Sequence, residues 1–205
     1  MKGYCFLSAV PMRREPSDRS EMVNQLLLGD TFLVLERQEK WSRIRCDYDG
    51  YEGWVDNKQY KEGRPDAHLG RPNGAPRPTS PATVAVEQYL GAPYLWGGRT
   101  VMGIDCSGLT QVCFKECGIV LLRDASQQAT QGTLVASLDD AQRDDLCFFC
   151  NSEGRIIHVG IYLGNGKIVH SSGQVRIDTL TSLGIVNDDT RQLTHTLHSI
   201  RRMEG

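Results

Sequence analysis

The stretch GIDCSGL, residues 103–109, places one cysteine between an aspartate and a serine, with glycines close on either side. The apolar residues that follow share one face of a helix: Leu109, Val112, Cys113 and Cys117. Gly118 ends this pattern, as glycine commonly does at a helix C-terminus. The spacing therefore predicts a helix that carries Cys106 in its first turn, with Asp105 as its N-cap.

A cysteine in this position is a candidate nucleophile. Unpaired N–H groups and the positive end of the helix dipole stabilise a thiolate, so we expect the pKa of Cys106 to lie below about 8.5. Gly103 and Gly108 allow backbone to approach a ligand closely, and Asp105 joins the candidates for contact with a substrate. The cysteines later in the helix lie on its apolar face and are expected to be inert core.

The base that a thiol nucleophile needs should be one of the five histidines. His68 lies in a proline-rich stretch, and His195 and His198 lie near a polar C-terminus, so we expect these three at the surface. In IIHVGIYL, residues 156–163, alternation puts His158 on the face opposite to the apolar residues. A glycine two residues further on leaves room there for a neighbour.

The sequence GNGKIVHSSG continues from this strand and predicts a hairpin. A two-residue turn would put His170 on the face away from His158, whereas a three-residue loop GNG pairs Leu163 with Lys167 and puts both histidines on one face. We therefore predict the longer loop, with positive φ at its last glycine, Gly166. A cysteine at a helix start and two histidines on facing strands follow the general plan of an activated thiol nucleophile.

Cys147 and Cys150 form a CxxC pair, a spacing that also occurs in redox and metal sites. No second pair accompanies them, and Phe148-Phe149 between them favours a buried strand. The sequence therefore predicts no metal site and no cofactor.

The first half of the chain differs in character from the second. Short β-rich runs punctuated by the turns Gly29-Asp30 and Asp49-Gly50 predict a small barrel, in which Trp41, Trp54 and Tyr51 serve in core or rim packing. Residues 61–81 hold five of the eight prolines and predict a linker. The predicted domains are 1–60, the linker 61–81, and 82–205. The last begins with a short helix that runs from the Ser80-Pro81 cap to Gly91.

Composition narrows the partners. A formal charge of −2 over 205 residues gives no basic surplus for nucleic acid. No apolar run approaches the roughly 20 residues that a membrane helix needs, and the N-terminus is too short and interrupted for a signal peptide. We therefore expect a cytoplasmic monomer without nucleic-acid or membrane partners, or a secreted or periplasmic protein if a leader was removed.

The motifs PYLWGG, GIDCSGL, RDASQQ, HVGIYLG and IVHSSG, in this order, resemble the catalytic domain of the NlpC-type cysteine peptidases. The GD turn, Trp41 and GYEGWV of the first half resemble a bacterial SH3-like domain. The resemblance implies an α+β protein, with an SH3-like β-barrel followed by a papain-like α/β domain built on an antiparallel sheet. It implies that Cys106 attacks a carbonyl, that His158 is the base, and that His170 orients His158. It also implies that Tyr94 and the backbone N–H of Cys106 polarise the carbonyl.

The domain combination is similar to that of the γ-D-glutamyl-L-diamino acid endopeptidases, which cut murein peptides that carry a free N-terminal L-alanine. This implies a murein-derived peptide as the substrate. Candidates for binding its ammonium group are Asp124 and, across the domain interface, Glu21 and Tyr51. Ser107 and Ser126 are candidates for the D-glutamate carboxylate.

Alternatives stay open at this point. Asp124 could instead cap a helix or pair with Arg123, and Glu21 could be an ordinary surface charge. The same framework serves an amidase, a transpeptidase or a hydrolase of polymeric peptidoglycan. Outside enzymes, the alternative is a peptide-binding module with an inert catalytic domain, and intact Cys106, His158 and His170 argue against it.

Overall fold

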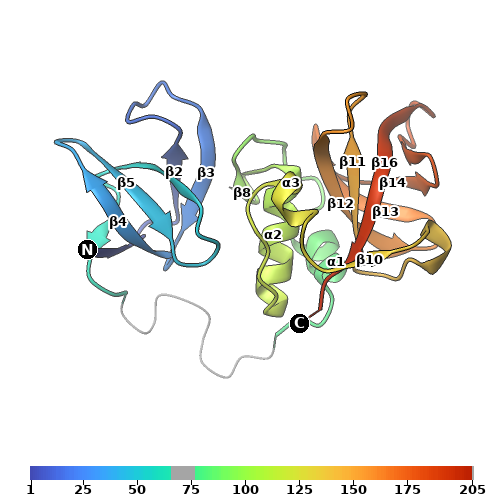
Figure 1. Cartoon of the computed structure of the whole chain (residues 1–205), viewed down its shortest axis with the longest axis horizontal. Coiled ribbons are helices and arrows are strands. Elements are labelled where there is room, and N and C mark those ends of the chain that lie inside the picture. Colours follow the sequence, from blue (N-terminus) through green and yellow to red (C-terminus); the bar gives the residue numbers. More distant parts are fainter. Residues whose placement is uncertain (66–76, 205) are drawn as a thin grey trace. The chain divides into compact units, whose positions relative to one another are not determined.

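A computed structural model describes residues 1–65 and 77–204, and the chain forms two compact units (Figure 1). The first unit comprises residues 1–76 together with 96–100, and the second comprises residues 77–95 together with 101–205. No helix in the described part of the chain has the length and apolar character needed to cross a membrane.

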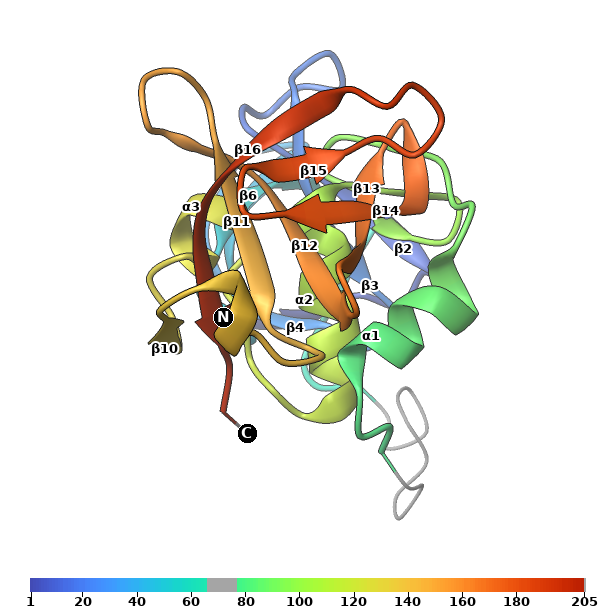
Figure 2. The same ribbon diagram turned by 90° about the vertical axis from the view of Figure 1, so that its right-hand side faces the viewer.

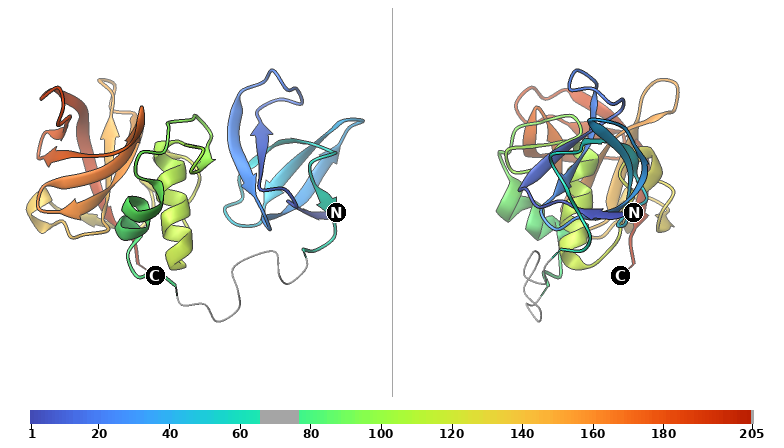
Figure 3. Two further views of the ribbon diagram at one scale, coloured as in Figure 1. Left: turned by 180° about the vertical axis from the view of Figure 1, so that it is seen from behind. Right: turned by 90° about the vertical axis from the view of Figure 1, so that its left-hand side faces the viewer.

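The first unit is an antiparallel β structure (Figure 3). Its strands are β1 (Lys2–Tyr4), β2 (Ala9–Arg13), β3 (Met22–Leu27), β4 (Thr31–Arg37), β5 (Trp41–Cys46), β6 (Glu52–Asp56) and β7 (Lys61–Glu62), hydrogen-bonded in the order β3-β2-β6-β5-β4-β1-β7. Alternate residues point into a core of small and apolar side chains that includes Val10, Phe32, Ile44 and Val55. Trp41 and Trp54 are half-buried at the rim of this unit, and Tyr51 packs against its core, as predicted.

The segment Trp96–Thr100 belongs to this first unit and includes β8 (Arg99–Thr100). Arg99 is buried and donates to the backbone carbonyl of Gln25 at 2.8 Å and to the carboxylate of Asp30 at 3.2 Å. Gly97 has a φ of 75°, and a Cβ there would collide with the Met22 carbonyl. Glycine is therefore required where this segment passes β3.

The helices of the second unit begin and end where the sequence predicts caps. The Ser80 side chain accepts from Thr83 N at the start of α1 (Pro81–Val84), and a π-helical turn, η1 (Ala85–Tyr89), continues it where we expected regular α-helix. The helix α2 (Cys106–Cys117) starts at the N-cap Asp105 and ends at Gly118, whose φ is 90°. Two short elements follow, α3 (Ala125–Gln128) and the 3₁₀ turn η2 (Leu138–Asp140).

The strands of the second unit form a sheet that closes on itself (Figure 2). The sheet consists of β10 (Thr133–Val135), β11 (Leu146–Cys150), β12 (Ile156–Gly164), β13 (Lys167–Ser172), β14 (Gln174–Thr181), β15 (Gly184–Val186) and β16 (Leu193–Arg202). The short strand β9 (Gly103–Ile104) lies outside this sheet. Neighbours run from β11 to β16 in order, and β16 pairs with both β15 and β11. The predicted antiparallel sheet is thus a barrel, and α2 packs against β12 and β13. The strand through Cys147 and Cys150 is confirmed, with Cys147 fully buried.

The hairpin between β12 and β13 reaches the predicted result by a different route. The predicted three-residue loop is wrong: Gly164 pairs with Lys167 across a two-residue turn, Asn165-Gly166, with φ values of 53° and 67°. A bulge between Tyr162 and Gly164 supplies the extra residue. That residue restores the parity, so Gly160 pairs with His170 and both histidines lie on one face, as predicted.

Candidate active site

Cys106 lies at the first position of α2 and is 7% exposed. Burial, and then the Asp105 charge, raise the pKa of its thiol to about 12, although the backbone N–H groups of Val159 and Ser107 favour the thiolate. The expectation of a lowered thiol pKa is therefore wrong for the protein without substrate. Removal from water outweighs the helix N-terminus here.

A buried ion pair holds the start of α2. The Asp105 carboxylate accepts from Gly108 N at 2.6 Å, which makes it the N-cap as predicted. It also accepts from both terminal nitrogens of Arg123, at 3.0 and 2.6 Å, and Arg123 donates to Ser107 Oγ at 2.9 Å. Arg123 is 1% exposed. These contacts fix the backbone around Cys106, and they occupy the two polar side chains that flank it.

The RDASQQ motif supports the same region. Asp124 is the N-cap of α3 in a capping box, with Gln127 Oε1 accepting from Asp124 N at 3.0 Å. Buried Gln128 accepts from Thr110 Oγ1 at 2.7 Å and donates to Ser107 O at 3.1 Å. Asp124 thus occupies the helix-cap position that the sequence left open as an alternative, and Ser126 lies exposed on the same short helix.

A row of buried polar side chains, the histidine row, crosses three neighbouring strands of the barrel: His158 on β12, His170 on β13 and Asp178 on β14. His158 Nε2 lies 2.9 Å from His170 Nδ1, and His170 Nε2 lies 2.9 Å from Asp178 Oδ2. Arg176 donates to both oxygens of Asp178, at 2.7 and 2.8 Å. His158, His170 and Asp178 are 5%, 1% and 1% exposed. The predicted histidine pair therefore continues into a carboxylate.

Gly160 makes this row possible. A Cβ at Gly160 would lie 2.8 Å from Ile168 Cδ1 and 3.0 Å from His170 Cβ. A larger residue would displace His170 from the space it occupies beside His158. The glycine noted in the sequence thus provides the room predicted for a neighbour.

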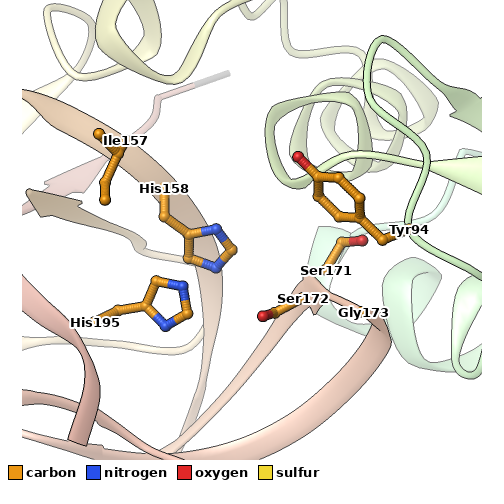
Figure 4. A pocket seen from close by; sticks show the side chains of 7 residues that line it. All are labelled: Tyr94, Ile157, His158, Ser171, Ser172, Gly173 and His195. Carbon is orange, nitrogen blue, oxygen red and sulfur yellow. The ribbon is translucent and has the colours of Figure 1, made fainter.

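Tyr94 faces the histidines across a pocket of about 320 Å³ (Figure 4). Its backbone N–H donates to Gly173 O at 2.9 Å, which ties the PYLWGG segment to the end of β13. Burial, and then the charges of Cys106 and Asp105, raise the pKa of Tyr94 to about 12. The phenol therefore keeps its proton at neutral pH and is available as a hydrogen-bond donor.

Comparison with known proteins agrees with this arrangement. The NlpC/P60 family model matches residues 91–193, half of the chain. The chain belongs to the NlpC/P60 family of cysteine peptidases. A second model, the bacterial dipeptidyl-peptidase SH3 domain, matches residues 12–59 in the first unit. The predicted fold class, an SH3-like β-barrel followed by an α/β peptidase domain, is confirmed.

Among curated NlpC/P60 relatives, a γ-D-glutamyl-L-lysine dipeptidyl-peptidase of Bacillus subtilis is 47% identical over 98 residues, 45% of this chain and 33% of that protein. The protein of the same name from Bacillus cereus is 38% identical over 87 residues, 42% of this chain and 26% of that protein. The chain thus matches a third or less of their lengths. A crystal structure of an NlpC/P60 family protein from Bacillus cereus aligns with a TM-score of 0.79 at 19% identity, over 98% of this chain and 99% of that chain. At this identity it shows the shared fold.

One histidine departs from the prediction. His195 was expected at the surface with His198, which is exposed, but His195 lines the pocket and stacks on His158 with ring centroids 4.2 Å apart (Figure 4). The reason is barrel closure, since β16 pairs with β15 and β11 and brings its inner face against the histidine row. The available signal in the sequence was Leu197, an apolar residue two positions further along β16, which indicates that this face of the strand is turned toward the core. His68 lies outside the described residues.

Electrostatics in this part of the NlpC/P60 domain favour neutral imidazoles. Burial, then His195 and His170, lower the pKa of His158 well below 6.5. Burial and His170 lower the pKa of His195 to about 4. Burial alone would raise the pKa of Asp178, but hydrogen bonds from His170 and Arg176 hold it below its usual range. Neutral rings of His158 and His195 thus lie in the same region as an ionised carboxylate.

The three histidines offer ligand atoms within 4.8 Å of one another, which is close enough to consider a metal. The planes of His158 and His195 are only 27° apart at a centroid separation of 4.2 Å, so their lone pairs lie in two nearly parallel planes, one stacked on the other. His170 uses both nitrogens in the row. As arranged, these rings hydrogen-bond and stack and do not converge on one ion.

The structure thus brings Cys106, His158, His170, Tyr94, Asp105 and Ser107 into one region of the second unit. Glu21 and Tyr51 belong to the first unit. There Glu21 accepts from Trp96 Nε1 at 2.7 Å and pairs with Arg14 at 2.8 Å. Asp178 was not predicted as a functional residue from the sequence. The short hairpin at Gly173 was the available signal in the sequence. It pairs His170 with Arg176, so Asp178, two residues further along β14, lies on the same face of the sheet as His170.

Proposed function

We propose that this protein is a cysteine endopeptidase that hydrolyses the γ-D-glutamyl–diamino acid bond of murein stem peptides. The observation that carries the proposal is the buried His158–His170 pair, of which His158 lines one pocket with Tyr94, together with the cysteine at the first position of α2. The dipeptidyl-peptidase names of the two Bacillus relatives support the substrate class. A role in recycling murein peptides inside the cell is part of the same proposal.

The chemistry follows from the protonation states. In the free protein Cys106 is a thiol and His158 a neutral imidazole, because burial disfavours both charged forms. As the sulfur attacks the γ-carbonyl, His158 accepts the thiol proton, and the Tyr94 O–H and the Cys106 N–H donate to the developing oxyanion. His158 then protonates the leaving amine of the diamino acid. Water, deprotonated by His158, hydrolyses the thioester and restores the thiol.

Substrate contacts remain part of the proposal. A free N-terminal ammonium needs a carboxylate partner once it leaves water. Asp124 and Glu21 are the proposed carboxylates, and the Tyr51 hydroxyl is proposed as a further hydrogen-bond acceptor. Ser107 and Ser126 are proposed for the D-glutamate carboxylate. Ser126 is exposed and available, whereas Ser107 already accepts from Arg123.

The test is mass spectrometry of peptides incubated with the reduced protein. L-Ala-γ-D-Glu-meso-diaminopimelate and its L-lysine counterpart should release L-Ala-D-Glu. The α-linked isomer tests the linkage, and an N-acetylated copy tests the ammonium requirement. Cleavage of the acetylated copy at the same rate would contradict the proposed contacts with the ammonium group. If no γ-linked peptide is cut but the peptides bind, the protein is the inert binding module instead.

A further inference from the structure

The strongest unassigned feature is the buried carboxylate at the end of the histidine row. Asp178 does not line the pocket and is 1% exposed, so substrate does not reach it. Donors approach it from several sides: His170 Nε2, Arg176 Nε and Nη2, and the backbone N–H of Asp188 at 2.9 Å. Such a group acts on the reaction only through His170.

The hydrogen bonds fix where each proton lies. An ionised carboxylate only accepts, so a neutral His170 ring carries its proton on Nε2 and leaves Nδ1 as an acceptor. His158 Nε2, 2.9 Å from that acceptor, must then be the donor. A neutral His158 with its proton on Nε2 has its lone pair on Nδ1.

From this chain of donors and acceptors we propose that Asp178 is a positioning residue that sets the tautomers of His170 and His158, so that Nδ1 of His158 is the base. The proposal rests on the proposed function of Cys106 and His158. When His158 takes the thiol proton on Nδ1, both its nitrogens carry hydrogen, and Nε2–H continues to donate to His170. The proton goes no further along the row.

Substitution of Asp178 by Asn should exchange the protonated and unprotonated ring nitrogens of His170 and His158. An amide has one acceptor and one NH₂ group. The Oδ1 position faces two fixed donors, Arg176 Nη2 and Asp188 N, whereas the Oδ2 position faces one, Arg176 Nε, and His170, whose ring can change tautomer. The NH₂ group therefore takes the Oδ2 position beside His170, where it opposes fewer fixed donors. His170 then accepts on Nε2 and donates from Nδ1. His158 must accept on Nε2 and carry its proton on Nδ1, where the base lone pair is needed.

The first experiment needs no substrate and no variant. Long-range ¹H–¹⁵N correlation spectra of the ¹⁵N-histidine-labelled wild-type protein at neutral pH distinguish protonated from unprotonated ring nitrogens. We expect a bare Nδ1 and a protonated Nε2 on His158, and the same pattern on His170. A proton on Nδ1 of His158 overturns the proposal. The spectra are independent of cleavage, so a failed peptide assay would reject the proposed function and leave this result standing.

The second experiment measures Asp178→Asn against Asp189→Asn. Asp189 holds Arg176 from outside at 2.7 Å and has a side chain 76% exposed, so its substitution leaves the row intact. Asp178→Asn should lower kcat about 10²- to 10⁴-fold, as expected for a base in the wrong tautomer, with little change in KM. Its spectrum should show the proton moved to Nδ1 of His158. A folded Asp178→Asn protein with wild-type kcat, or with unchanged tautomers, overturns the proposal.

Discussion

The buried aspartates Asp105 and Asp178 of the second unit each pair with an arginine, and the two pairs have different roles. Asp105 and Arg123 join at 2.6 Å beneath the start of α2, and Asp178 and Arg176 join at 2.7 Å behind the histidines. The first pair meets a backbone N–H and a serine, none of which changes protonation near neutral pH. The second meets an imidazole. The same ion pair is thus structural in one place and controls proton positions in the other.

The largest predicted effect concerns the structural pair. Arg123→Leu leaves the Asp105 carboxylate buried without its main partner, which should lower the free energy of unfolding by about 3–5 kcal/mol. Arg176→Leu should lower the free energy of unfolding by a smaller amount, because Asp178 keeps the hydrogen bonds from His170 and Asp188 N. Urea unfolding at neutral pH measures both.

The matched control is Arg155→Leu, which removes an ion pair to Glu153 with both side chains mostly exposed. Exposed pairs contribute about 0–1 kcal/mol, so this variant should unfold nearly as the wild type does. If Arg123→Leu were no less stable than Arg155→Leu, the buried pair would not anchor the start of α2.

A smaller effect is expected in the pH dependence of the free energy of unfolding, and it should distinguish the histidine region from the Asp105–Arg123 pair. His158 has a lowered pKa in the folded protein, so its neutral form contributes stability that is present above about pH 6.5 and is lost as the pH falls below it. The loss approaches about 1.4 kcal/mol per pH unit for each such proton, and His195 contributes in the same direction down to about pH 4.

Urea unfolding at several pH values between neutral and acid conditions measures this slope. His158→Gln should reduce it, whereas His198→Gln, at an exposed position, should leave it unchanged. If the free energy of unfolding of His158→Gln depended on pH as steeply as that of the wild type, His158 would not be buried as a neutral ring.

The sequence predicted most local features and missed what barrel closure creates. Caps, the Cys106 helix and the shared face of His158 and His170 follow from short-range spacing, so they were accessible. The turn at Asn165 was predicted wrongly because a bulge can replace a longer loop without changing the parity. The burial of His195 depends on β16 meeting β15, a long-range pairing that the polar sequence near the C-terminus does not indicate.

The thiol pKa shows the same limit. A helix N-terminus is visible in the sequence, but the depth of burial is not, and burial dominates at Cys106. Two turns further along α2, the thiol of buried Cys113 also has a raised pKa. Cys106 differs from Cys113 because it lies near Tyr94 and accepts from the backbone N–H of Val159, the residue after His158.

The most direct test of the central claim compares these two thiols. Release of L-Ala-D-Glu from the γ-linked tripeptide is measured by mass spectrometry for the wild type, Cys106→Ala and Cys113→Ala, with folding of each checked by circular dichroism. Cys106→Ala should lower the rate on the order of 10⁴-fold or more, and Cys113→Ala should keep the wild-type rate per folded molecule. Cleavage that persists in Cys106→Ala would contradict the account.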